Sequence, residues 1–384
     1  MKNLKFLLLF ILAFLVFWSC EKEPINSDLI NEQTTELSAR KAHSSKLQNR
    51  VINSDALKNN FIGNSHTRKL QIYTPPGYKK NGPEGYPVVY LLHGFPFSEK
   101  AFIDPNSWDE WISNPYLFSN EYPDFPEEGF RLWVDNLIDL EVIDPMIIVM
   151  PNSGTEPYGF SFYTNSMLNG NFEDFIVNDL VSYMDKNYNT IPNASGRAVV
   201  GHSQGGYAAF KFGMLHPNKF GTVASHSGLL YVDAVLSFAD VIADENPDGF
   251  TGPHPMKFMT SALYAMSAAW SPNINNPPFF VDLPFEFDEY GDIQSVDSVI
   301  DQWHQNDVYS LLDLHSYNFN SLNGIYFDVG IYDELGTQLA HQPVITRLNE
   351  KFIEYTLDTY EGGHHTHMFQ QLSKSLAFCS NSME

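Results

Sequence analysis

Residues 198–214 read AVVGHSQGGYAAFKFGM. A short apolar run leads into Gly201-His202-Ser203-Gln204-Gly205-Gly206, and residues 207–214 then carry apolar side chains at helical spacing. A strand that turns sharply into a helix needs glycine on both sides, because the backbone and the helix close against each other. Such a turn projects the Ser203 hydroxyl from the carboxyl edge of a sheet, in front of the free N–H groups of a helix N-terminus. We therefore interpret Ser203 as a catalytic nucleophile.

Around this turn, apolar runs alternate with helical periods. The runs that indicate strands are 68–74, 88–92, 146–150, 198–200, 222–224, 325–329 and 353–360. Helical spacing marks residues 172–184 and the segment from Ser203 to Pro217. Near-continuous apolar runs fit strands that are covered on both faces, so the pattern predicts an α/β fold with a mostly parallel sheet and crossover helices. Ordered structure is expected to begin near Phe61.

A large insertion is predicted between Gly228 and Gly324, before the strand 325–329. It is rich in Pro, Asn and aromatic residues and holds 14 acidic residues against one basic residue, Lys257. A structureless loop of this length is improbable in a compact domain, so residues 229–323 are expected to form a cap with helices of their own over one end of the sheet. Its cluster of Asp288, Glu289 and Asp292 fits a solvated acidic surface better than a Ca²⁺ site.

An activated serine requires a general base and an acid that orients it, in the chain order nucleophile, acid, histidine. Asp333 follows the strand 325–329 closely enough to reach an imidazole, whereas Asp328 lies inside that strand. Glu334 is a rival for the same role, and a helix-capping function is the structural alternative for Asp333.

The base is expected just after the strand 353–360, where the chain reads Gly362-Gly363-His364-His365-Thr366-His367. Paired glycines let the backbone turn sharply, which presents His364 better than His365, while His367 is expected to begin the closing helix. This spacing lacks the helical H-x-x-x-H pattern of zinc sites, so neither a metal nor any other cofactor is predicted.

Two backbone N–H groups are predicted to form an oxyanion hole. One belongs to Gln204, the residue after the nucleophile, and the other to Phe95 in the loop that follows the strand 88–92. Gly94 permits close approach of that loop to the substrate, and His93 is expected to hold the loop by a side-chain hydrogen bond.

Five ordered segments resemble the esterase D family of α/β-hydrolases, which includes feruloyl and acetylxylan esterases, S-formylglutathione hydrolases and bacterial mycolyltransferases. They are YTPPGY at 73–78, YPVVYLLHG at 86–94, PMIIVMPN at 145–152, FEDF at 172–175 with Asp179-Leu180, and GHSQGG at 201–206. The resemblance runs from Arg68 to Phe378. It implies an α/β-hydrolase fold, a Ser203–Asp333–His364 triad and oxyanion donors at Phe95 and Gln204.

These residues predict a serine carboxylic ester hydrolase that works through an acyl-enzyme on a small-molecule or polysaccharide-linked ester. An acyltransferase of the mycolyltransferase type would use the same machinery. A glycan-binding surface lipoprotein, using exposed tryptophans at 108, 111, 133 and 303, is the alternative from another class. The chain's formal net charge of −24 argues against nucleic acid as a partner.

The N-terminal residues resemble a bacterial lipoprotein signal. Lys2 and Lys5 precede an apolar stretch from Phe6 to Trp18, which is shorter than the ~20 residues that span a bilayer as a helix. We predict a signal peptide at 1–19, a lipidated Cys20, a flexible tether to residue 60 and a hydrolase domain at 61–384. Cys379 would then be the remaining thiol, expected as a buried side chain. The predicted location is the cell envelope, with secretion as the alternative.

Overall fold

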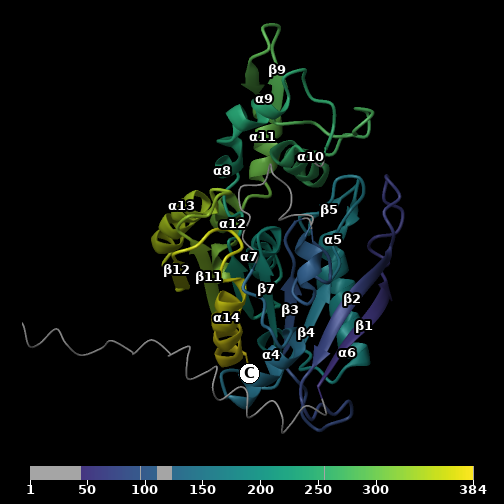
Figure 1. The fold of residues 1–384 in the computed structure, drawn as a ribbon, viewed down its shortest axis with the longest axis vertical. Helices are drawn as coiled ribbons and strands as arrows, with labels where there is room; N and C mark the ends of the chain where they lie inside the picture. The colour runs from purple at the N-terminus through teal and green to yellow at the C-terminus, as the bar shows by residue number, and fades with distance from the viewer. Residues whose placement is uncertain (1–44, 96, 110–122, 255, 384) are drawn as a thin grey trace, which may run out of the picture. The chain divides into compact units, whose positions relative to one another are not determined.

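The computed structural model describes residues 45–95, 97–109, 123–254 and 256–383 (Figure 1). The predicted signal peptide, Cys20 and Trp111 lie outside these residues. Among the helices of the described ranges, none combines the length and the hydropathy needed to cross a bilayer.

An eight-stranded sheet forms the centre of the fold, in the order β1-β2-β4-β3-β7-β8-β11-β12. Its strands are β1 (Lys46–Asn53), β2 (Thr67–Thr74), β3 (Val88–Leu92), β4 (Ile147–Pro151), β7 (Arg197–His202), β8 (Thr222–His226), β11 (Gly324–Gly330) and β12 (Thr356–Tyr360). From β4 to β12 all neighbours are parallel, whereas β2 pairs antiparallel with both β1 and β4. The predicted α/β class with a mostly parallel sheet is confirmed.

Helices cover both faces of the sheet (Figure 1). They are α4 (Phe130–Asp139), α5 (Phe172–Asp174), the π-helical turn η2 (Phe175–Leu180), α6 (Val181–Asn187), α7 (Gln204–Leu215), α12 (Val308–Asn320), α13 (Thr337–Glu350) and α14 (Met368–Ser382). Side chains of β3 alternate between two buried clusters: Val88 and Tyr90 pack with α6, α7 and α12, while Val89 and Leu91 pack with α4 and α14. This two-sided burial explains why the central strands are apolar throughout. Cys379 is buried in α14, as predicted.

Short elements connect these layers. They are the 3-10 turns η1 (Pro105–Trp108) and η3 (Ala194–Gly196) and the paired strands β5 (Asn165–Ser166) and β6 (Gly170–Asn171).

The predicted insertion carries helices of its own and extends beyond the carboxyl ends of the parallel strands (Figure 1). Its elements are α8 (Asp233–Leu236), α9 (Ala239–Glu245), α10 (Phe258–Trp270), the hairpin β9 (Phe285–Phe287) and β10 (Ile293–Ser295), and α11 (Asp297–His304). The last helix in this stretch, α12, packs on α7, with the rings of Phe210 and Phe319 5.2 Å apart. It serves as the crossover helix between β8 and β11, so the part that caps the sheet ends with α11.

The sheet begins earlier in the chain than the sequence predicts. Strand β1 pairs with β2 from Lys46 opposite Thr74 to Asn53 opposite Thr67, so ordered structure starts well before Phe61. Of its eight residues only Ile52 is buried, because β1 is an edge strand. A strand with so little apolar alternation resembles a polar linker in sequence.

Candidate active site

Ser203 occupies the turn between β7 and α7, and its backbone adopts φ 57° and ψ −117°. A positive φ is strained for a residue with a Cβ atom, and such strain persists where the surrounding structure enforces it. Here the close packing of the turn, which only glycine allows on either side of Ser203, holds the backbone in this conformation. A Cβ atom on Gly201 would lie 2.2 Å from the backbone of Gly205, and one on Gly205 would lie 2.3 Å from the Leu92 carbonyl oxygen. The strand-turn-helix expected from the sequence is therefore present, with Ser203 at its apex.

Asp333 and His364 come together from two loops that follow β11 and β12. Nδ1 of His364 lies 2.8 Å from Oδ2 of Asp333, and both side chains are buried. The remaining acceptor positions of Asp333 receive the N–H of Leu335 at 3.0 Å and the hydroxyl of Thr337. Asp333 thus holds the imidazole ring and contacts Thr337, the first residue of α13, but it does not cap that helix, whose N-cap residue is Gly336.

Electrostatics favour a charged pair at this position. Burial acts to lower the pKa of His364, but the charge and hydrogen bond of Asp333 outweigh it and raise the pKa above its ordinary value. Burial acts to raise the pKa of Asp333, yet the attraction of His364 and the three hydrogen bonds leave it below the usual value. An imidazole held this way is a strong general base whose imidazolium form is stabilised.

The two other carboxylates considered for the acid contact different groups. Oε2 of Glu334 accepts the backbone N–H of His364 at 2.9 Å, which fixes the loop without touching the ring. Asp328 lies inside the sheet, where Oδ2 contacts Nδ1 of His226 at 2.8 Å and the hydroxyl of Tyr326 at 3.0 Å.

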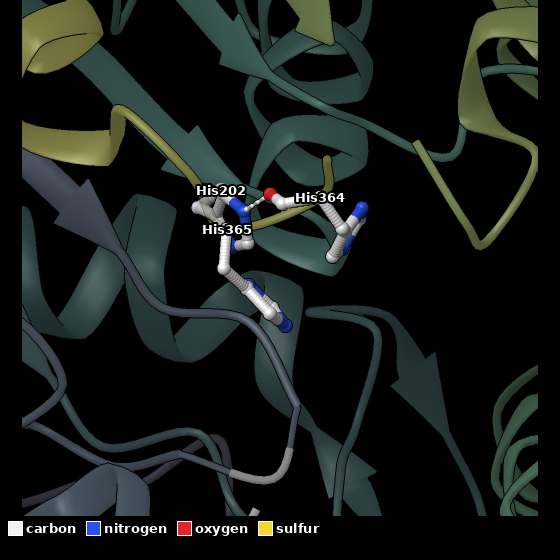
Figure 2. A group of neighbouring side chains, drawn as sticks. All are labelled: His202, His364 and His365. Atoms are coloured by element: carbon white, nitrogen blue, oxygen red, sulfur yellow. Dashed lines mark hydrogen bonds between the residues drawn. The ribbon is translucent and has the colours of Figure 1, made fainter. Parts of the chain in front are cut away.

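Three buried imidazoles lie together here, those of the candidate base His364, His202 and His365 (Figure 2). Nε2 of His202 donates to the carbonyl oxygen of His364 at 2.8 Å, which ties the histidine loop to the end of β7. Burial lowers the pKa of His202 to about 3, and burial lowers that of His365 well below its ordinary value, so both rings are neutral. The ring of His365 packs against Trp108 with centroids 4.8 Å apart, whereas His367 is exposed and precedes α14.

These three histidines have ring nitrogens within 4.8 Å of one another, a spacing that a metal ion could bridge. A cation bound by all three would need a ring nitrogen of His364, yet Nδ1 of that ring is already held by Asp333. It would also compete with proton transfer at the remaining nitrogen. That no metal takes part stays a prediction.

The loop after β3 lies directly against the turn that carries Ser203. A Cβ atom on Gly94 would lie 3.0 Å from the Cβ atom of Ser203. His93 holds this loop, as expected: its Nδ1 lies 2.8 Å from the Gly94 carbonyl oxygen, and its Nε2 accepts the N–H of Ser153 at 3.1 Å. The ring of Phe95 packs on Phe160 with centroids 4.2 Å apart. Phe95 and Gln204 therefore both lie near Ser203, one in this loop and one at the first position of α7.

A cavity of about 70 Å³ opens beside these residues. Ser203, His364, Phe95 and Gln204 all line it, so the structure brings four of the five predicted site residues to one space, with Asp333 directly behind His364. The rest of the wall is almost wholly apolar and comes from the segment 160–162, the loop after β8 and the helices of the cap. It consists of Phe160, Phe162, Leu229, Val235, Phe238, Phe258, Met259, Ala262, Met266, Leu335 and Thr337. Sequence reasoning missed these cap residues, because nothing in the pattern shows which face of a cap helix meets the sheet.

One sequence-based alternative does not fit the structure. Of the tryptophans proposed to bind glycans, Trp108, Trp133 and Trp303 are buried, so they pack in the core. In the acidic cluster of the cap, Oδ1 of Asp288 accepts the N–H groups of Tyr290 and Asp292, which closes the turn of the β9–β10 hairpin.

Comparisons with known proteins show the family and the fold of the chain. A family model of esterases, described as "Putative esterase", matches residues 64–377. A protein named "Esterase MT1326" from Mycobacterium tuberculosis is 28% identical over 159 residues, which cover 41% of this chain and 28% of that protein. An "Endo-1,4-beta-xylanase/feruloyl esterase" from Xylanibacter ruminicola is 29% identical over 198 residues, covering 48% of this chain and 24% of that protein. The chain thus spans only about a quarter of the length of these relatives.

Solved structures show the same fold. A ferulic acid esterase superimposes with a TM-score of 0.56 at 17% identity, covering 88% of this chain and 100% of that one. An S-formylglutathione hydrolase from Staphylococcus aureus superimposes with a TM-score of 0.53 at 13% identity, covering 88% and 99%. At these identities the likeness establishes the α/β-hydrolase fold and leaves the substrate open.

Proposed function

The chain belongs to the esterase family over residues 64–377, and from this membership we propose that it is a serine carboxylic ester hydrolase with Ser203, His364 and Asp333 as its triad. The observation that carries the proposal is the buried 2.8 Å contact between His364 Nδ1 and Asp333 Oδ2 at the wall of the cavity that Ser203 lines. A histidine oriented by a carboxylate beside an exposed serine is the arrangement that generates an alkoxide nucleophile.

The reaction proceeds in two halves. The Ser203 Oγ attacks the ester carbonyl carbon as its proton passes to Nε2 of His364, and the collapsing tetrahedral intermediate expels the alcohol, which takes that proton. Water then attacks the acyl-enzyme carbonyl and gives a proton to the same nitrogen, and the proton returns to Oγ as the carboxylic acid leaves. The N–H groups of Phe95 and Gln204 stabilise the oxyanion in both halves, each worth about 3 kcal/mol in comparable enzymes.

The acyl group is proposed to be compact and apolar. The cavity of about 70 Å³ has room for a few non-hydrogen atoms, and its far wall offers Met259, Ala262 and Met266. A hydroxylated or charged acyl chain would lose hydrogen bonds to water on entering such a wall. The alcohol half then lies toward solvent, so an acyl decoration on a polysaccharide, outside the cytoplasm, fits the site. The lipid anchor at Cys20 remains part of this proposal.

Replacing Ser203 with Ala tests the chemistry. Hydrolysis of p-nitrophenyl acetate should fall by about 10³-fold or more, and a fluorophosphonate probe should no longer label the protein. Ser373→Ala, on the remote helix α14, is the matched control and should keep full activity and labelling. Turnover that survives in Ser203→Ala would exclude this serine as the nucleophile.

A further inference from the structure

A second hollow, of about 620 Å³, lies between β1 and α6. Three basic residues, Lys46, Arg50 and Lys80, share its wall with three tyrosines, Tyr78, Tyr183 and Tyr188. Its volume is within the range of sites that bind small molecules.

The wall is built by two regular elements. Lys46, Gln48 and Arg50 alternate along β1, so their side chains share one face of the strand. Tyr183 and Asn187 are four residues apart on α6 and therefore share one face of the helix. Strand and helix thus present cationic, amide and aromatic groups to the same space.

The charge of this hollow is opposite to that of the molecule. The chain carries 46 acidic against 22 basic residues, yet none of the described residues that line the hollow is acidic. Within the described part of the chain, Lys46, Arg50 and Lys80 form no ion pair with a carboxylate; Arg50 donates instead to the Asn49 carbonyl oxygen at 3.0 Å and to the side chain of Gln48. Three cations gathered without an internal counter-charge are suited to an external anion.

The tyrosines add a second kind of recognition. The rings of Tyr78 and Tyr188 lie 6.4 Å apart at 48°, and both are half-buried, which leaves ring surface and one polar end toward the hollow. Burial raises the pKa of Tyr188, and the nearby Arg50 opposes that rise, so the hydroxyl remains a neutral donor. Aromatic faces that adjoin amide side chains suit a ring with an apolar face and a polar rim.

We infer that this hollow binds an acidic sugar residue, with the sugar carboxylate held by Arg50 and Lys80 and the pyranose ring against Tyr78 and Tyr188. A membrane surface would meet projecting cations on a convex face, whereas these line a concavity with aromatic walls. Gln48 and Asn187 supply the amide groups that sugar hydroxyls require.

The hollow lies at the β1 edge of the sheet, and β2, β4 and β3 stand between β1 and β7, the strand that leads to Ser203. Lys46 is level with the start of β4, through Thr74, whereas Arg50 pairs with Leu70, which is level with Pro151 at the end of β4. Ser203, Asp333 and His364 all follow the carboxyl ends of parallel strands. An acidic sugar bound in the hollow therefore leaves the catalytic cavity free, so this inference does not depend on the proposed hydrolysis.

Calorimetric titration of the purified protein tests the inference, with xylotriose carrying one glucuronate as the probe and plain xylotriose as its neutral counterpart. The acidic tetrasaccharide should bind, and neutral xylotriose should bind at least about tenfold more weakly. Arg50→Gln with Lys80→Gln should weaken the acidic probe by about tenfold or more, while Lys186→Gln, an exposed position on α6 outside the hollow, should change its affinity less than about twofold. Melting temperature checks that the variants fold.

Hydrolysis of p-nitrophenyl acetate should be unchanged in the Arg50 and Lys80 variants, which separates this site from the catalytic one. Equal binding of the two oligosaccharides, no binding of the acidic one, or unchanged binding in the double variant would overturn the inference. Inorganic phosphate that competes at equal affinity, or preferential binding to phosphatidylglycerol vesicles, would overturn it in favour of a phosphate or a membrane surface.

Discussion

Asp333 and Glu334 are neighbours in one loop and contact two different parts of His364. Asp333 holds the ring nitrogen Nδ1 at 2.8 Å, and Glu334 holds the backbone N–H at 2.9 Å. Only the first contact can set the tautomer, and Asp333 stabilises a positive charge on the imidazole more strongly than Glu334 does. The two residues should therefore differ sharply when their charges are removed.

Asp333→Asn should lower kcat for p-nitrophenyl acetate by about 10³ to 10⁴-fold, because the amide favours the wrong tautomer and cannot stabilise the imidazolium. The pH profile should also move. In the native protein the carboxylate raises the pKa of His364, so the base loses its proton, and activity rises, at a higher pH than for an ordinary histidine. Without that charge burial dominates, and the acidic limb of kcat/KM should shift to lower pH.

Glu334→Gln is the matched control for this pair. The glutamine keeps an oxygen that can accept the His364 N–H, so we expect kcat within about fivefold of the native value and an acidic limb moved only slightly. If this variant were the more damaged of the two, Glu334 would be the acid and the assignment of Asp333 would fail.

Ser203, Asp333 and His364 could be proposed from sequence because each lies within a few residues of the end of a predicted strand. The glycines beside Ser203 and His364 mark sharp turns, and a sharp turn depends on neighbouring residues alone. Residues 364–367 include three histidines close to the end of a strand. Which of them can act as the base depends on how their rings pack. His365 packs against Trp108, a residue far away in the chain, while His364 faces Asp333.

Helix α10 of the cap decides how much space the acyl group has. Met259, Ala262 and Met266 lie on the face of this helix that lines the cavity beside Ser203. A side chain enlarged on that face should exclude longer acyl chains and leave the catalytic groups in place.

Ala262→Leu should lower kcat/KM for p-nitrophenyl butyrate by about tenfold or more relative to the acetate, since one or two methylenes are worth about 1–3 kcal/mol in such a pocket. Met266→Ala should change the ratio in the opposite direction by enlarging the cavity. The acetate rate within each variant is the internal control. An unchanged butyrate-to-acetate ratio in both variants would mean that the acyl group binds elsewhere.

Helix α12 begins with a buried carboxyl group. Burial raises the pKa of Asp307 to about 7, although its Oδ1 accepts the N–H groups of Val232 at 3.3 Å and Tyr309 at 3.4 Å. A folded-state pKa above the unfolded value means that the folded protein binds the proton more tightly. Stability is therefore lost as pH rises from about 4 to about 7 and is level above that range.

Asp307→Asn removes this dependence, because the amide is neutral at every pH. The variant should match the native protein near pH 4 and exceed it by up to about 4 kcal/mol in free energy of unfolding at pH 8, measured by urea denaturation. Asp301→Asn, exposed on α11, should show no such trend. A variant that is less stable at pH 8 would indicate that the charged form makes the better helix cap.

Elements at the margins of the fold were the hardest to predict. Strand β1 has one buried residue, Ile52, because it is an edge strand that leaves most of its residues in contact with solvent. The strand is held by backbone hydrogen bonds to β2, and backbone hydrogen bonds cannot be predicted from the hydropathy of the side chains. Strands 88–92 and 222–224 were predictable for the opposite reason, since two covered faces require apolar residues at every position.

Across the whole molecule, charge is unevenly distributed. Residues 229–304, which cap the catalytic end, hold 12 acidic residues and one basic residue, whereas the described residues that line the hollow between β1 and α6 include three cations and no carboxylate. Net charge alone predicts repulsion of every anionic polymer. The distribution predicts instead that an acidic glycan is repelled at the cap and held at the β1 edge of the sheet, so that neutral ester-bearing segments approach the triad.

This asymmetry should appear in the salt dependence of catalysis. The esters 4-acetoxybenzoate and 4-acetoxybenzamide share one acyl group and differ by a negative charge on the leaving group. Because salt shortens the screening length from about 30 Å at 0.01 M to less than 10 Å above 0.15 M, kcat/KM for the benzoate should rise several-fold over that range while the benzamide rate stays constant.

Neutralising Asp240 and Asp244, both exposed in the cap, should reduce the benzoate effect, whereas neutralising Asp55, an exposed residue just after β1, should not. A benzoate rate that falls with salt would mean that the cap attracts anions, and the proposed orientation of an acidic glycan would then be wrong.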